Sequence, residues 1–161
     1  MATDARLPRE VFLILAAVGW IDGKLHFSEL DAITDAARAE GLGSDELEDI
    51  QRAIRAPIEF GEIDIEKLSS ADRLYTYAIA RWVTSVDGST ESVEIAALEV
   101  LGHALRLTRK GREAMDAAVS ELASRPQGER PARLDFAGLK RAIAARVEAA
   151  AEARKRTNEN S

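Results

Sequence analysis

An Asp-Gly pair followed by five residues and then Glu occurs twice in the sequence. The first copy runs from Asp22 to Glu29 and the second from Asp87 to Glu94. Asp-Gly is typical of a turn, so both carboxylates of one copy can point into one hollow. Carboxylate and carbonyl oxygens are the ligands that hard cations prefer. We therefore interpret the two loops as candidate sites for a divalent cation: Ca²⁺, Mg²⁺ or Mn²⁺.

One further position in each loop carries a side chain able to ligate a metal ion. It is His26 in the first copy and Glu91 in the second, and the two positions are equivalent in the repeat. The alternative is purely structural, with the aspartates as turn residues and the glutamates stabilising helix starts by about 0.3–1 kcal/mol each. The predicted metal ligands are Asp22, Glu29, Asp87, Glu94, Glu91 and His26.

The spacing of Asp, Gly and Glu also matches part of a calcium-binding EF-hand loop. The first and third ligand positions of such a loop would be Val18 and Trp20 in the first copy, and Val83 and Ser85 in the second. Val and Trp have no side-chain oxygen to offer a calcium ion. We therefore do not expect a true EF-hand.

Amphipathic segments must position these loops, since apolar residues recur at helical spacing on both sides of each copy. No run alternates with period two over the length of a strand, so the sequence predicts an all-α fold. We expect a compact bundle of seven to eight helices. Their predicted starts, several of them at capping residues, lie at or near Pro8, Ser28, Ser44, Ser70, Ser92, Thr108 and Asp135.

The two halves of the chain align when Asp22 is placed on Asp87. This predicts two pseudo-symmetric helix–Asp-Gly loop–helix units related by a twofold axis. We expect a single helical domain over residues 1–152 and a polar, disordered tail over 153–161. Apolar positions that match in the alignment are Phe12 with Tyr77, Ile14 with Ile79, Val18 with Val83, Leu30 with Ile95, Ile33 with Leu98, and Leu42 with Leu107.

Composition narrows the possible functions. The 161 residues carry a formal net charge of −6, which argues against a nucleic-acid-binding surface. The sequence contains no Cys, so it can form neither a disulfide nor a cysteine zinc site. The longest apolar run, residues 11–21, is shorter than the roughly 20 residues of a membrane span. The first ten residues lack the pattern of a secretory signal. We expect a cytoplasmic protein with no transmembrane segment.

The duplicated helix–Asp-Gly-x5-Glu–helix unit resembles the TerB-like domain family, which includes the tellurite-resistance protein TerB and the N-terminal domain of DjlA-type co-chaperones. The resemblance covers about Pro8 to Leu122. It implies divalent-metal binding at the acidic positions and a role in responses to metal oxyanions and other stress. It also implies protein partners, often near membrane complexes. The chain has no His-Pro-Asp motif, so a J-domain role is not expected.

Three functions stay open at this point. The first is a non-enzymatic, cation-binding interaction module, and the second is a metal-free helical scaffold for protein partners. The third is a hydrolase that uses Asp22 and Asp87 as an acidic pair. The sequence has no nucleophile elbow, phosphate loop, His-Glu-x-x-His or dinucleotide fingerprint. We therefore predict no catalytic and no organic-cofactor-binding residues, and we assign Trp20 and Trp82 to the core.

Overall fold

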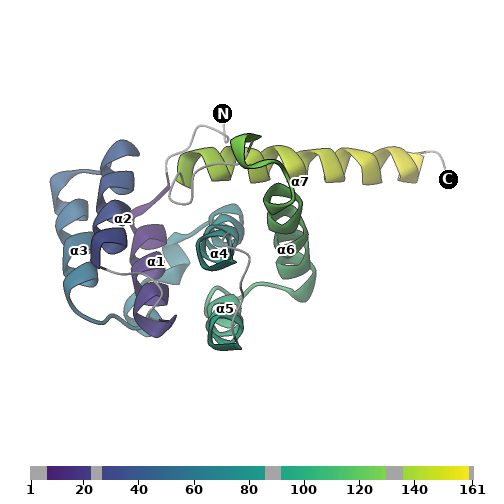
Figure 1. Cartoon of the computed structure of the whole chain (residues 1–161). Coiled ribbons are helices and arrows are strands. Elements are labelled where there is room, and N and C mark those ends of the chain that lie inside the picture. The colour runs from purple at the N-terminus through teal and green to yellow at the C-terminus, as the bar shows by residue number, and fades with distance from the viewer. Residues whose placement is uncertain (1–6, 23–26, 86–91, 130–135, 160–161) are drawn as a thin grey trace.

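The computed structural model describes residues 7–22, 27–85, 92–129 and 136–159. These residues form seven α-helices and three short 3₁₀-helices and contain no strand, which confirms the all-α prediction (Figure 1). The α-helices are α1 (Arg9–Asp22), α2 (Phe27–Ala39), α3 (Ser44–Arg55), α4 (Ser70–Ser85), α5 (Ser92–Ala104), α6 (Arg109–Ala123) and α7 (Phe136–Glu159). The 3₁₀-helices are η2 (Phe60–Glu62), η3 (Ile65–Lys67) and η4 (Gln127–Glu129).

The helix α1 lies at the centre of the fold. It packs against α2, α3, α4 and α5. Every residue from Val11 to Val18 except Leu13 is buried, so α1 is apolar on almost every side. A helix that is apolar all round is a core helix, because no face of it needs to meet water. The wide apolar pattern in this part of the sequence predicted that position.

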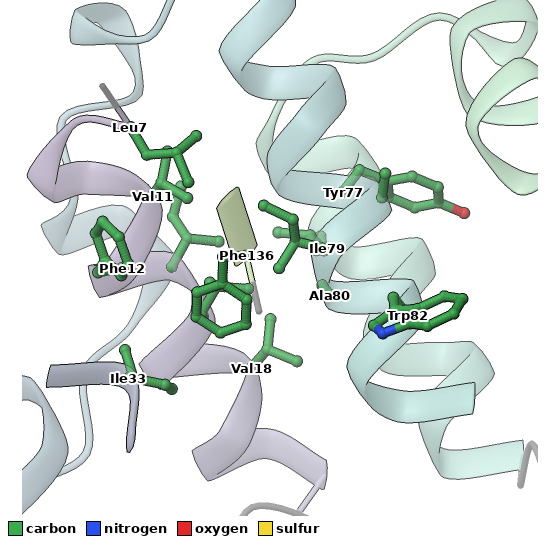
Figure 2. Packing of buried hydrophobic residues seen from close by; sticks show 14 of the residues in the cluster. Leu7, Val11, Phe12, Val18, Ile33, Tyr77, Ile79, Ala80, Trp82 and Phe136 are labelled. Atoms are coloured by element: carbon green, nitrogen blue, oxygen red, sulfur yellow. The ribbon is translucent and has the colours of Figure 1, made fainter. Parts of the chain in front are cut away.

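Aromatic packing joins the last helix to this centre. Phe136, the first residue of α7, lies between the side chains of α1 and those of α4 (Figure 2). Its ring centroid is 6.1 Å from that of Phe12, with the planes tilted by 45°. Such tilted pairs contribute about 0.5–1.5 kcal/mol beyond the burial of their area. Phe136 therefore anchors the start of α7 in the core.

The helix α7 packs on α4 and α6, and its C-terminal part extends beyond α6 (Figure 1). It is helical as far as Glu159. The sequence predicts a disordered tail from residue 153 onward, whereas residues 153–159 belong to α7. Residues 149–156 are Ala, Glu, Arg and Lys only, which have the best intrinsic helix propensities. The helix therefore continues past Ile143, the last of its described side chains that is buried.

The helix starts show how closely capping residues locate a boundary. Thr108 caps α6 as predicted, since its Oγ1 accepts a hydrogen bond of 3.0 Å from the N–H of Gly111. Ser44 does not cap α3: the cap is Gly43, one residue earlier. The carboxylate of Glu46 accepts the Gly43 N–H at 3.2 Å, which is the bond that the third helical residue makes in a capping box.

The two tryptophans have different environments. Trp82 on α4 is fully buried, as the sequence predicts. Trp20 on α1 is only partly buried, and its Nε1 donates a hydrogen bond of 2.8 Å to the backbone oxygen of Ala53 in α3. An indole N–H needs an acceptor when water is excluded, so Trp20 fixes α1 against α3 by a polar contact as well as by packing.

Candidate functional site

The helices place three of the six predicted metal ligands at loop boundaries. Asp22 is the last residue of α1, and Glu29 and Glu94 are the third residues of α2 and α5. The side chains of these three lie outside the described part of the structure. His26, Asp87 and Glu91 lie outside the described residues altogether. The cation site therefore stays a prediction. The structure describes the helices that flank the two loops and not the side chains of the six predicted ligands.

The frame brings the two copies of the motif into one packed unit. The helix before the first loop, α1, contacts both helices of the second copy, α4 and α5. The first turns of α2 and α5 follow the loops and carry Glu29 and Glu94 at matching positions. Carboxylates in a first turn interact favourably with the helix dipole, so these two glutamates suit their places with or without a metal ion.

The bounds of the helices that follow each loop repeat with the same spacing as the motif, whereas those of α1 and α4, which precede the loops, do not. Adding 65, the difference between positions 22 and 87, to the bounds of α2 gives the bounds of α5. The same shift takes the start of α3, Ser44, to the start of α6, Arg109. The repeat in the sequence therefore coincides with a repeat in secondary structure over these helices. The twofold axis between the units stays a prediction.

The helix ends after each loop also match in backbone detail. At the end of α2, the N–H of Leu42 bonds to the oxygen of Ala37 at 3.3 Å. At the end of α5, the N–H of Leu107 bonds to the oxygen of Gly102 at 3.1 Å. This six-to-one bond, with the five-to-two bond beside it, defines a Schellman motif at each end. The five-to-two bonds are Gly41 N–H to Arg38 O and Arg106 N–H to His103 O, each 3.0 Å.

The described side chains form no further metal cluster and no membrane-spanning helix. Within residues 7–22, 27–85, 92–129 and 136–159, no three His, Asp or Glu side chains converge as a metal site would require. The side chains of the loop ligands named above are not among those described. None of the helices in the described ranges is long and apolar enough to cross a membrane.

A polar network links α4 to α6, away from the predicted loops. The hydroxyl of Tyr77 donates a 2.8 Å hydrogen bond to Oδ1 of Asp116, and Nε of Arg81 lies 3.1 Å from the same oxygen. The guanidinium carbon of Arg112 lies 5.8 Å from the centroid of the Tyr77 ring. Tyr77 is only 2 % exposed, so its hydroxyl requires such a partner. The network therefore fixes α6 against α4.

The electrostatics of this network favour a neutral phenol. Burial raises the pKa of Tyr77, and the hydrogen bond to Asp116 and the charge of that carboxylate raise it further. Arg112 acts in the opposite direction and lowers the pKa in part. A phenol whose pKa is raised is a poor general base near neutral pH. The arrangement therefore favours a structural role over proton transfer.

No sequence pattern indicates this network, because its residues follow no known motif. Tyr77 and Arg81 are one turn apart on α4, whereas Asp116 belongs to another helix 35 residues later than Arg81 (116 minus 81). A second group of charges at the start of α1 is also long-range. Nη1 of Arg9 lies 2.7 Å from Asp49 on α3, and its Nη2 lies 3.0 Å from Glu10. Helix packing alone brings such pairs together.

Comparison of the chain with protein-family models, curated proteins and solved structures gives no match. The resemblance to the TerB-like family therefore rests on the duplicated motif and its helical context.

Proposed function

We propose that this chain is a non-enzymatic, TerB-like module that binds a divalent cation through the acidic residues of its two Asp-Gly loops. The observation that carries the proposal is the shared spacing of the motif and of the helices that follow it. The shift of 65 residues relates the Asp-Gly pairs, the bounds of α2 and α5, and the Schellman ends that follow them. Because the helices that follow the two loops are repeated in this way, we expect the two loops to have the same role.

In the proposed mechanism the chain supplies oxygen ligands and no reacting group. Asp22 and Glu29 would serve one loop and Asp87 and Glu94 the other, with His26 and Glu91 as additional ligands. Because α1 contacts both α4 and α5, a cation held at the loops would fix the angle between the two helix pairs. Occupancy of the site would then change the surface offered to a protein partner. A stress-response role, to tellurite or another oxyanion, belongs to the same proposal.

The test is thermal unfolding of the metal-stripped full chain, first with chelator and then with Ca²⁺, Mg²⁺ or Mn²⁺. A ligand at 100 times its dissociation constant stabilises the fold by about 2.7 kcal/mol. For a domain of this length that is a rise in Tm on the order of 5–10 °C. We expect the rise with one of these ions and its loss in the double variant Asp22→Asn with Asp87→Asn.

A matched control keeps the same change of charge away from the loops. Glu48 on α3 and Glu152 on α7 are both exposed, so Glu48→Gln with Glu152→Gln alters net charge without touching the motif. This control should retain the full metal-dependent rise. A rise of equal size in the Asp22 and Asp87 double variant would contradict the proposal, and so would the absence of a rise with all three ions. The metal-free scaffold would then be the better account.

A further inference from the structure

A hollow of about 200 Å³ lies between α2 and α3. Its lining differs in chemistry from the acidic loops. Pockets for organic ligands are usually about 300–1,000 Å³, so this one suits a smaller guest. The side chains around it are mostly hydrogen-bond donors. They are Thr34, Asp35, Arg38, Gln51, Ile54 and Arg55.

The charge of this hollow is positive in a protein whose net charge is −6. Two guanidinium groups face one carboxylate among its lining residues, and that carboxylate is already engaged. Oδ1 of Asp35 lies 3.0 Å from Nη1 of Arg38. Arg55 makes no ion pair within the described part of the chain. The α2–α3 hollow therefore offers one complete, uncommitted guanidinium and part of a second.

A neighbouring hollow provides a comparison. It is larger, about 330 Å³, and its charged lining is Asp49, Glu62 and Arg52. Two carboxylates there face a single guanidinium, so an anion would be repelled. The excess of donors is therefore a property of the α2–α3 hollow and not of every depression on this part of the surface.

Thr34 also lines this hollow. Thr34 is 6 % exposed, and its buried Oγ1 has no hydrogen-bond partner among the described residues. A threonine inside a helix ordinarily satisfies its hydroxyl by donating to the carbonyl one turn earlier. A buried hydroxyl without any partner carries a desolvation penalty, so it calls for a specific explanation. An acceptor atom seated in the hollow would provide one.

We propose that the α2–α3 hollow binds a small tetrahedral oxyanion of the phosphate or sulfate type. Arg38 and Arg55 would supply charge-assisted hydrogen bonds, while the Thr34 hydroxyl and the Gln51 amide would donate to the remaining oxygens. Guanidinium groups match the geometry of such anions because they present several N–H donors in a plane. This proposal does not depend on the cation site.

A purely structural account of Arg55 makes a different prediction. Arg55 is the last residue of α3, where a cation stabilises the helix through its dipole. In that account Arg55→Gln lowers Tm and changes no binding property, because no anion is bound. The measurement must therefore follow binding directly and not stability alone.

The experiment is isothermal titration of the full chain with inorganic phosphate, sulfate and a simple phosphomonoester, with ionic strength held constant by sodium chloride. We expect saturable binding that weakens about tenfold in each of Arg38→Gln and Arg55→Gln, the effect of losing one charge-assisted hydrogen bond. The matched control is Arg52→Gln, since Arg52 is an exposed arginine of α3 that does not line this hollow. Its affinity should stay within about twofold of the wild type.

Two further variants separate a built site from diffuse attraction. Asp35→Asn removes the carboxylate that competes for Arg38, so phosphate should bind severalfold more tightly. Thr34→Val keeps the shape of the side chain without its hydroxyl, so affinity should fall while the protein stays folded. Tighter binding of the ester than of free phosphate would identify a phosphorylated metabolite as the source of the anion. No binding of any of the three anions, or equal weakening in Arg52→Gln, would overturn the proposal.

Discussion

Gly41 and Arg106 adopt the same left-handed backbone conformation at the ends of α2 and α5. Their φ angles are 90° and 57°, and the two residues are related by the shift of 65 that relates the Asp-Gly loops. Each is the residue that closes a Schellman motif. Glycine is the usual choice at this position because it has no Cβ to clash with the preceding carbonyl. Arg106 therefore carries a strain that Gly41 does not.

This difference predicts that glycine and alanine affect the free energy of unfolding differently at these two equivalent positions. Gly41→Ala should lower the free energy of unfolding by about 1–2 kcal/mol, the usual cost of a left-handed residue with a Cβ. At Arg106 the comparison of interest is glycine against alanine, because both remove the ion pair with Glu66. Arg106→Gly should be more stable than Arg106→Ala by about 1 kcal/mol. Denaturant unfolding of the three variants measures both effects.

The control for this pair is a residue of the same helix end with an ordinary conformation. His103 is exposed on the last turn of α5 and has a helical backbone, so glycine gains nothing there. His103→Gly should be less stable than His103→Ala by about 1 kcal/mol. If Arg106→Gly were also less stable than Arg106→Ala, the left-handed conformation would not be a source of strain.

Sequence patterns predicted the helices well where local chemistry decides the boundary. Thr108 caps α6, α1 ends at the Asp of the first Asp-Gly pair, and α4 ends two residues before the second pair. Capping preferences failed by one residue at Ser44, since the N-cap of α3 is Gly43, whose N–H bonds to Glu46. They gave no signal for Arg106, since an arginine rarely takes a positive φ and no pattern marks the exception.

The side chain of Arg112 lies against Gly102 and predicts an unusual response to substitution there. A Cβ built on Gly102 would lie 2.8 Å from Nε of Arg112 and 3.0 Å from its Cδ. Replacing a helical glycine by alanine ordinarily stabilises a protein by about 1 kcal/mol. Here the methyl group must displace the guanidinium that lies over the Tyr77 ring. We therefore expect Gly102→Ala to give no gain or a net loss of stability.

A double-mutant cycle isolates the cause. In the background of Arg112→Ala the obstruction is gone, so Gly102→Ala should stabilise the protein by about 1 kcal/mol. The coupling between the two sites should then be about 1 kcal/mol or more. Equal effects of Gly102→Ala in both backgrounds would show that the guanidinium does not restrict this position.

Candidate sites were harder to predict than helices because most of their contacts are long-range. The Asp-Gly loops could be named from sequence since each is a short, repeated motif. The α2–α3 hollow combines Thr34 and Arg38 with Arg55 of the next helix, so only the packing of α2 on α3 brings them together. The polar network that links α4 to α6 could not be predicted from the sequence for the same reason.

The Tyr77 hydroxyl should make a measurable but modest contribution to stability near neutral pH. Tyr77→Phe removes the 2.8 Å hydrogen bond to Asp116 and leaves the ring in place. Asp116 keeps its contact with Arg81 at 3.1 Å, so the carboxylate is not left without a partner. The loss should be about 1 kcal/mol, the net value of one hydrogen bond. A loss above about 3 kcal/mol would mean that the network acts as one cooperative unit.

The same variant predicts how stability changes at alkaline pH. The pKa of Tyr77 is raised by burial and by Asp116, so the folded protein keeps the phenol proton at pH values where the unfolded chain has lost it. The contribution of Tyr77 is fully present below the unfolded pKa of about 10 and is lost as pH rises through the folded pKa. The free energy of unfolding should therefore fall above pH 10 with a slope of at most about 1.4 kcal/mol per pH unit from this group.

In Tyr77→Phe this part of the fall is absent, so the gap between wild type and variant should narrow as pH rises above about 10. Tyr75 provides the comparison, because burial is also the main cause of its raised pKa. Tyr75→Phe should remove its own share of the alkaline slope without removing the bond to Asp116. Urea unfolding of the three proteins between neutral and alkaline pH gives each difference directly. A gap for Tyr77→Phe that stays constant or widens over this range would contradict the raised pKa and the burial that causes it.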